Sequence, residues 1–285
     1  MNRQKRVAAV HDISCFGRCS LTVALPIISA AGIECAVVPT AVLSTHTGGI
    51  DGYTFHDLTD EIMPIVQHWK QLNLRFDAIY TGYLGSFRQL DIVSAMFDLL
   101  GSGNTFKIVD PVMADNGVLY KSFSPDFPKG MRKLCEKADI IIPNITEAVF
   151  LLDEPYKEGP YTREYIESLL KKLAEIGAKQ IVLTGVYFDN EQLGAAVYDC
   201  KSGQIDYSFA GWIEGYYHGT GDVFGSAFVA ALLSGCSLAQ ANAEAVKFTV
   251  DSIARTKAAG TDIRFGVDFE NGLGEFAARL MKCKG

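Results

Sequence analysis

Short runs rich in Ile and Val alternate with longer stretches of helical period, and this alternation limits the possible folds more than any other feature of the chain. Apolar runs of this length are typical of strands that are buried on both faces. Their alternation with amphipathic helices indicates βαβ units around a mostly parallel sheet. The predicted strands span residues 6–11, 33–38, 76–80, 106–109, 138–142 and 180–183.

The predicted helices lie between these strands and after the last of them. They span residues 21–31, 57–72, 87–100, 145–152 and 162–176, and then residues 222–234 and 238–257, with which we expect the chain to end. Residues 193–199 and 204–209 are predicted to form an antiparallel hairpin at one edge of the sheet. No linker, composition break or internal repeat divides the sequence, so we expect one domain over residues 1–285.

Composition and charge argue against several classes of protein. The 285 residues include 26 Lys and Arg against 33 Asp and Glu, and the resulting net charge of −7 argues against a general nucleic-acid binder. No apolar run approaches the ~20 residues of a membrane helix, and the apolar segment near the start is too short for a signal peptide. The seven cysteines are scattered without a CxxC pair. We therefore expect reduced thiols in a cytoplasmic protein, with no disulfide and no zinc site.

Polar and glycine-rich residues follow the predicted strands. Open parallel sheets bind their ligands beyond the carboxyl ends of the strands, so these residues are candidates for a binding site. They are His11-Asp12, Thr40, Thr81-Gly82-Tyr83, Asp110-Pro111, Pro143-Asn144 and Thr184-Gly185.

Gly219-Thr220-Gly221-Asp222 is the sharpest local motif, because its glycines precede an apolar helix. Glycines allow a phosphate to approach the backbone N–H groups closely, and the start of a helix adds positive potential. Asp222, in the first turn, could then accept a proton from an attacking hydroxyl. A plain turn followed by an N-cap aspartate would explain the same four residues without a function.

Pro143-Asn144-Ile145-Thr146-Glu147 places a second carboxylate in the first turn of a helix. Glu147 could hold a water molecule of hydrated Mg²⁺, or it could simply complete a capping box. A turn explains Asp110-Pro111 and Thr184-Gly185 as well as a contact with a nucleotide does. The P-loop pattern GxxxxGK[ST] and the dinucleotide fingerprint are absent, so residues 219–222 are the best candidate for a phosphate cradle.

Taken in order, these motifs resemble those of the pyridoxal kinases of the ribokinase-like superfamily, through nearly the whole chain. Gly-Thr-Gly-Asp and Asn-x-x-Glu mark the superfamily, whereas Ser44-Thr45-His46-Thr47 and Thr81-Gly82-Tyr83 are closer to pyridoxal kinases. The resemblance implies a three-layer α/β/α sandwich with a mostly parallel central sheet. It also implies ATP-dependent phosphorylation of the 5′-hydroxymethyl group of pyridoxal, pyridoxamine or pyridoxine, in a homodimer.

Carried over by position, the resemblance implies a role for each motif. Asp222 would be the catalytic base, and Gly219, Thr220 and Gly221 would form the anion hole. The ATP-binding residues would be Asp110, Asn144, Glu147 and Thr184, with residues 208–213 beside the adenine. Glu147 would hold Mg²⁺ through water. The substrate-binding residues would be Asp12, Thr47, Tyr83 and Asp222, with His46 in the same loop as Thr47.

Three positions depart from the pattern of pyridoxal kinases. Asp12 stands where a serine is usual, and an aspartate favours a protonated ring nitrogen or an amine. Ile142 replaces a threonine that often accompanies the monovalent-cation site implied by the resemblance. His218 precedes Gly219, as a histidine often does in the related hydroxymethylpyrimidine kinases.

Two other functions therefore stay open at the level of sequence. One is hydroxymethylpyrimidine kinase activity in thiamine synthesis. The other is a catalytically silent B6-binding protein. The presence of Asp222, Asn144 and Glu147 argues against the second, because a protein that only binds has no need of a base and of metal-binding groups.

Overall fold

The computed structural model describes residues 3–284. The strands are β1 (Arg6–Phe16), β2 (Glu34–Thr45), β3 (Phe55–Asp57), β4 (Ala78–Thr81), β5 (Phe106–Val109), β6 (Ala114–Asp115), β7 (Val118–Leu119), β8 (Ile140–Ile141), β9 (Gln180–Val186), β10 (Gln192–Asp199) and β11 (Gln204–Gly211). The α-helices are α1 (Leu21–Ala30), α2 (Thr59–Gln71), α3 (Phe87–Leu100), α4 (Phe127–Cys135), α5 (Ile145–Leu151), α6 (Arg163–Ala174), α7 (Thr220–Leu233), α8 (Leu238–Ala259) and α9 (Leu273–Leu280). Three short 3₁₀ helices are η1 (Ile263–Phe265), η2 (Glu270–Gly272) and η3 (Met281–Lys284).

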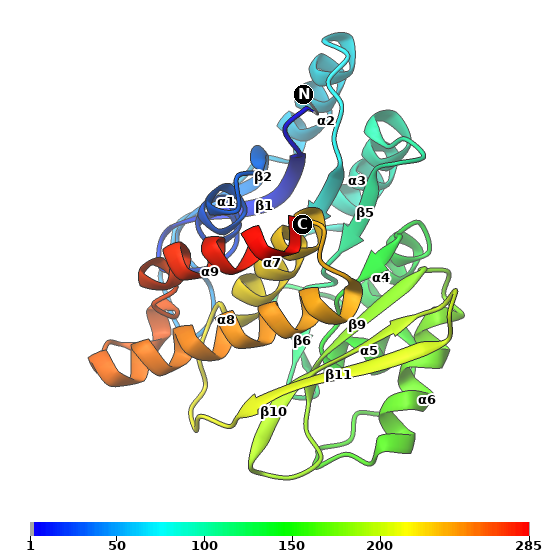
Figure 1. Cartoon of the computed structure of the whole chain (residues 1–285). Coiled ribbons are helices and arrows are strands. Elements are labelled where there is room, and N and C mark those ends of the chain that lie inside the picture. Colours follow the sequence, from blue (N-terminus) through cyan, green and yellow to red (C-terminus); the bar gives the residue numbers. More distant parts are fainter. Residues whose placement is uncertain (1–2, 285) are drawn as a thin grey trace.

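One nine-stranded sheet forms the centre of the structure, in the order β11-β10-β9-β8-β5-β4-β1-β2-β3 (Figure 1). The strands from β9 to β2 pair in parallel. Only β3 at one edge and the β10–β11 hairpin at the other are antiparallel. This arrangement confirms the predicted α/β class, the mostly parallel sheet and the edge hairpin.

Helices cover both faces of the sheet and make it the middle of three layers. On one face, α2 to α6 pack over apolar side chains such as Val10 and Ile79. On the other face, α1, α7, α8 and α9 pack over side chains such as Val7 and Ile108 (Figure 1). Successive residues of a strand point to opposite faces, so a strand between two helical layers must be apolar at nearly every position. This requirement accounts for the continuous Ile and Val runs in the sequence.

The predicted elements agree with the structure best where the periodic pattern is strong. The helix over residues 87–100 and the strand over residues 106–109 have the predicted bounds. β1 and β2 continue beyond their predicted ends, to Phe16 and Thr45, because the two strands go on pairing past a bulge between His11 and Ile13. The expectation that the chain ends with two long helices is wrong, since α9 follows them.

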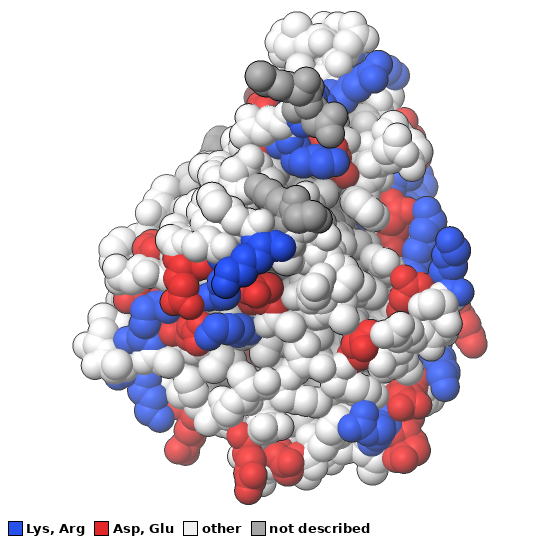
Figure 2. Space-filling model, in the orientation of Figure 1, with Lys and Arg blue, Asp and Glu red and all other residues white. Residues whose placement is uncertain are grey.

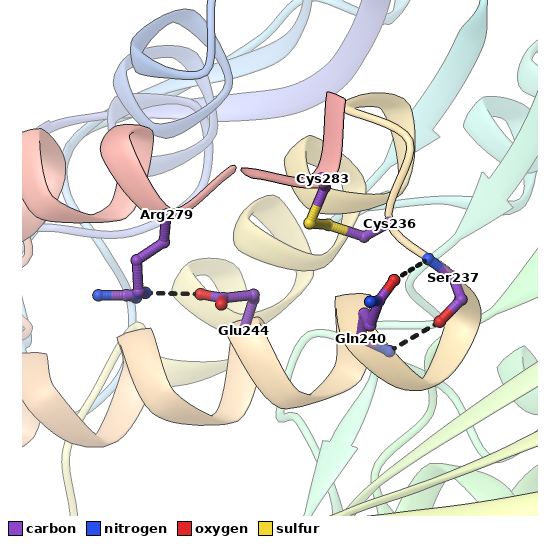
Figure 3. Close-up of a disulfide and its surroundings, with 6 residues drawn as sticks. All are labelled: Cys236, Ser237, Gln240, Glu244, Arg279 and Cys283. Atoms are coloured by element: carbon purple, nitrogen blue, oxygen red, sulfur yellow. Dashed lines mark hydrogen bonds and ion pairs between the residues drawn. A yellow bond between two sulfur atoms is a disulfide. The ribbon is translucent and has the colours of Figure 1, made fainter. Parts of the chain in front are cut away.

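The expectation of reduced cysteines only is also wrong, because Cys236 and Cys283 form a disulfide (Figure 3). Cys236 precedes α8 and Cys283 lies in η3, with 47 residues of separation. The two cysteines meet because α9 packs back beside α8, where the Arg279 guanidinium pairs with the Glu244 carboxylate at 2.7 Å (Figure 3). Spacing along the sequence gives no sign of such a contact. The remaining cysteines are free.

The surface of the face seen in Figure 2 carries Lys and Arg interspersed with Asp and Glu. Exposed side chains of opposite charge form pairs, such as Lys129 with Asp126 at 2.8 Å. Within residues 3–284, no helix combines the length and the apolar character that a membrane span requires.

We predict that reduction of the disulfide lowers the free energy of unfolding by about 2–4 kcal/mol, because the bond closes a long loop in the unfolded chain. Thermal unfolding with and without dithiothreitol measures the effect. Cys283→Ser should lose this response to reductant, whereas Cys200→Ser, which changes a free cysteine, should keep it. Equal unfolding midpoints of the wild type with and without reductant would contradict the prediction.

Candidate active site

The start of α7 packs closely against the turn between β1 and α1. Gly219 is the N-cap of α7 and has φ of +72°, a backbone conformation that favours glycine. A Cβ atom at Gly219 would overlap the carbonyl oxygen of Arg18. The missing side chain therefore allows the helix start to rest directly on this turn.

Asp222 lies in the first turn of α7, as predicted, and its carboxylate accepts a hydrogen bond from the backbone N–H of Ser20. The pKa of Asp222 is raised to about 7, mainly by burial and in part by the charge of Asp12, while the bond from Ser20 opposes the rise. A carboxyl group with this pKa can exchange a proton near neutral pH.

A second glycine fixes the helix against the sheet. A Cβ atom at Gly225 would overlap the hydroxyl oxygen of Tyr80 and would lie 3.5 Å from Oδ2 of Asp110. Tyr80 belongs to β4, and Asp110 directly follows β5. The position of Asp222 relative to the ends of these strands is therefore set by the close packing of α7 against the Tyr80 and Asp110 side chains.

Three aspartates from different parts of the chain come together here. Asp12 and Asp110 are 5% and 7% exposed. Burial raises the pKa of Asp110 well above its usual range, and the charges of Glu147 and Asp222 raise it further. Burial also raises the pKa of Asp12, although hydrogen bonds with Ser20 and Ser14 oppose the shift. The site thus concentrates negative potential that favours a cation or a proton.

Glu147 and Asn144 form the capping box that the sequence left open as an alternative. Asn144 Oδ1 accepts from the backbone N of Glu147 at 2.9 Å, and Glu147 Oε2 accepts from the backbone N of Asn144 at 2.9 Å. Oε1 of Glu147 accepts from the backbone N of Met113 at 3.1 Å. Burial raises the pKa of Glu147 to about 8 in spite of these bonds. Its carboxylate is held in one orientation, about 3% of the residue being exposed.

The residues expected around a nucleotide gather at the same edge of the sheet. Thr184 forms a parallel bridge with Asn144 and donates its backbone N–H to the carbonyl of Pro143 at 2.9 Å. Contrary to the prediction, Thr184 and Gly185 lie within β9, which continues to Val186. Of the predicted adenine segment, residues 208–211 belong to β11, and the ring of Trp212 contacts that of Tyr187 with centroids 5.0 Å apart.

The residues expected around the substrate ring come from β1, from the segment after β4 and from the loop after β2. Tyr83 is half-buried and donates its hydroxyl to Oγ of Ser122 at 3.3 Å. Burial is the main cause of the raised pKa of Tyr83, and the charge of Asp12 contributes to it. Thr47 is exposed in the loop after β2, beside the buried His46. Tyr83 and His46 are therefore both near Asp12, and Thr47 adjoins His46 in the sequence.

Several predicted strand-end residues are parts of strands. His11 and Asp12 lie inside β1, at its bulge, and Thr40 lies inside β2. Ser44 and Thr45, which were predicted to belong to a polar loop, also lie inside β2. His11 is fully buried against the ring of Tyr80, and burial lowers its pKa to about 3. It is a neutral core residue, whereas its neighbour Asp12 faces the site.

Asp110 and Glu147 could assist in binding a divalent cation. Among residues 3–284, no three His, Cys, Asp or Glu side chains group closely enough to form a metal cage. The donors at this site are carboxylate oxygens, and Mg²⁺ bound by few protein ligands keeps its waters and substrate phosphates. The carboxylate oxygens of Asp110 and Glu147 therefore fit the ligand preference of Mg²⁺.

Sequence reasoning missed the groups that enclose the site from the C-terminal half of the chain. Arg18 donates its backbone N–H to the carbonyl of Phe265 at 2.9 Å, and the carbonyl of Arg264 contacts Nε2 of His46. Arg264 and Phe265 belong to η1, whose sequence has no periodic pattern. Gly225 was also missed, because a glycine inside an apolar helix gives no sign of what it contacts.

The fold, with a glycine-lined helix start at the carboxyl edge of a mostly parallel sheet, is that of the ribokinase-like kinases. The chain belongs to the phosphomethylpyrimidine kinase family, whose model matches residues 24–265. It is therefore a phosphotransferase, and the resemblance seen in the sequence is confirmed.

Two solved structures are similar over nearly the whole chain. A "putative phosphomethylpyrimidine kinase" from Bacteroides thetaiotaomicron VPI-5482, crystallised with pyridoxal, is 39% identical, with a TM-score of 0.91 and coverage of 96% of both chains. Pyridoxal kinase from Lactobacillus plantarum is 32% identical, with a TM-score of 0.87 and coverage of 98% of both chains. A chloroplastic thiamine biosynthetic bifunctional enzyme of Arabidopsis thaliana is 27% identical over 82% of this chain, which spans only 43% of that enzyme.

Two glycine variants should separate structure from chemistry in this motif. Gly219→Ala should destabilise the fold by about 1–3 kcal/mol, because alanine meets both a left-handed backbone and the Arg18 carbonyl. A Cβ atom at Gly221 meets no atom within 4 Å, so Gly221→Ala should keep the melting temperature. It should nevertheless slow phosphoryl transfer, because the methyl group enters the proposed anion hole. Thermal unfolding and kcat measure the two effects, and a fully active Gly221→Ala variant would remove Gly221 from the anion hole.

Proposed function

We propose that this protein is a pyridoxal kinase, which transfers the γ-phosphoryl group of ATP to the 5′-hydroxymethyl group of pyridoxal, pyridoxamine or pyridoxine. The observation that carries the proposal is that the buried Asp222 lies near both Asp110 and Asp12. Glu147 is also near Asp110, and Tyr83 is near Asp12. We assign the start of α7, Asn144 and Thr184 to the nucleotide, and we assign Asp12, Tyr83 and the loop after β2 to the substrate ring. The pyridoxal-bound relative supports this choice of substrate.

In the proposed reaction, the substrate hydroxyl donates its proton to the Asp222 carboxylate as its oxygen attacks the γ-phosphorus. The bond to the leaving oxygen of ADP then breaks. Backbone N–H groups of Gly219, Thr220 and Gly221, together with the positive end of α7, stabilise the charge on the transferred group. Phosphoryl transfer depends mainly on such positioning and charge neutralisation.

Asp110 and Glu147 are proposed to hold Mg²⁺, with Glu147 acting through a water molecule, while Asn144 and Thr184 contact ATP. The ion supplies neutralisation of phosphate charge when it is bound. The capping box fixes Glu147 and Asn144 for this purpose, because each side chain is held by the backbone of the other residue. The monovalent cation stays a prediction of the resemblance.

Asp12 is proposed to recognise a protonated ring nitrogen or an amine of the vitamer. Its burial makes an unpaired charge costly, so a cationic partner would stabilise the carboxylate form. Tyr83 offers a ring face and Thr47 a hydroxyl for the substrate. From the resemblance we also infer one kinase domain over residues 1–285, a homodimer and a cytoplasmic location.

Hydroxymethylpyrimidine kinase activity is the second candidate. His218 before Gly219, the family match and the Arabidopsis thaliana relative favour it. Both substrates present a primary hydroxyl on a small aromatic ring, so Asp222 would serve either reaction.

Asp222→Asn should keep the fold and lower kcat by ~10²–10⁴-fold, because the amide has the shape of the carboxylate but accepts no proton from the hydroxyl. In the wild type, kcat/KM should rise with pH up to about 7, since burial keeps Asp222 protonated below that pKa. In Asp222→Asn, kcat/KM should no longer show this rise with pH. Turnover within about threefold of wild type would show that Asp222 is not the base.

A panel of acceptors at fixed ATP should show a preference for pyridoxal or pyridoxamine over hydroxymethylpyrimidine of about tenfold or more in kcat/KM. Tyr83→Ala should raise KM for the vitamer more than KM for ATP, because it removes a contact with the ring and leaves the glycine motif intact. Equal or better use of hydroxymethylpyrimidine would make the second candidate the function of this protein.

A further inference from the structure

Four side chains form a continuous set of contacts across the site, and we call them the strap. The rings of His46 and His218 have centroids 5.1 Å apart, and those of His218 and Tyr216 have centroids 4.9 Å apart. Tyr216 donates its hydroxyl to Oδ2 of Asp115 at 2.9 Å. The strap thus connects the loop of residues 46–54, the loop of residues 215–219 and β6.

Glycines keep space for the two histidine rings. A Cβ atom at Gly48 would lie 2.7 Å from Nδ1 of His218 and 3.3 Å from Nδ1 of His46. A Cβ atom at Gly17 would lie 3.1 Å from Cδ2 of His46. Any side chain at these glycines would push the rings aside, so the ring contact depends on the backbone on both sides of it.

Hydrogen bonds fix His46 within its own loop. Nδ1 of His46 accepts the backbone N–H of Gly48 at 3.1 Å, and Nε2 contacts the carbonyl oxygen of Arg264. These two contacts give the ring a single orientation. Burial and the neighbouring His46 lower the pKa of His218, whereas the charge of Asp115 opposes this shift.

The loop of residues 215–219 has a different anchor at each end. At its carboxyl end, Gly219 rests on the Arg18 carbonyl, which fixes the start of α7. Nearer its amino end, the exposed Tyr216 reaches Asp115, and the ring of Tyr217 packs against the apolar core. His218 stands between these anchors and is the residue of this loop whose ring meets that of His46.

We propose that His218 is a positioning residue that couples the loop of residues 46–54, on the ring side of the site, to the loop that leads into the anion hole. This inference rests on the proposed function. His218 directly precedes Gly219 and contacts His46 and Gly48. Through these contacts, His218 keeps the substrate ring at a fixed distance from Asp222. Its loss frees the ring-side loop, while Gly219 and Asp222 keep their own anchors.

A double-mutant cycle of His46→Ala and His218→Ala tests this coupling. His218→Ala should raise KM for pyridoxal by about fivefold to tenfold, the effect of losing one ring contact, and should change KM for ATP less than twofold. The double variant should resemble the single variants, because each removes the same contact. Tyr216→Phe should give a smaller rise, and His68→Ala, an exposed histidine of α2, should give none.

Amide hydrogen exchange of the substrate-free protein gives a second readout. Peptides covering residues 46–54 should exchange faster in His218→Ala, with unchanged exchange in α7. Additive KM effects together with unchanged exchange would overturn the inference. If the wild type fails to phosphorylate pyridoxal, the proposed function fails, and the exchange of residues 46–54 alone then decides whether His218 holds this loop.

Discussion

The close contact of the α7 backbone with Arg18 and Tyr80 is the constraint on which the rest of the site depends. Gly219 rests on the Arg18 carbonyl, and Gly225 rests on the Tyr80 hydroxyl. These two contacts lie on either side of Asp222 and fix its Cα position from two directions. The Arg18 carbonyl belongs to the backbone and the Tyr80 side chain is fully buried, so neither can easily move aside and α7 has little freedom relative to β1 and β4. A group that must accept a proton in line with phosphoryl transfer requires such placement.

Burial of several carboxylates makes the site costly for the free protein. Asp12, Asp110, Asp222 and Glu147 each have a raised pKa, mainly because of burial. An apolar core would be more stable than such a cluster, so folding stability does not explain it. A ligand that brings cations would stabilise these buried carboxylates. The proximity of the carboxylates would then contribute to the binding free energy of that ligand. The cluster is thus best explained as the counterpart of a charged substrate complex.

Sequence predicted the position of Asp222 and Glu147 because both depend on local signals. The start of a helix can be predicted from a glycine, a capping residue and the onset of a helical repeat of apolar residues. These signals place each of the two carboxylates in the first turn of its helix. The position of Asp12 was harder to predict, because a polar pair such as His11-Asp12 normally marks the end of a buried strand. β1 continues through His11 and Asp12 because a bulge and pairing with β2 hold them. The disulfide, the strap and the contact of η1 with Arg18 join segments far apart in sequence, and no local pattern encodes them.

The two interpretations of Glu147 that the sequence left open are parts of one arrangement. A carboxylate that only completed a capping box would need to accept just the backbone N–H of the N-cap residue. Glu147 instead accepts backbone N–H groups of Asn144 and Met113, from the segments that follow β8 and β5. These bonds hold the carboxylate beside Asp110 and also tie together the ends of two neighbouring strands. The structural role therefore creates the geometry that a metal-linked role would need, and a capping box at a sheet edge does not argue against function.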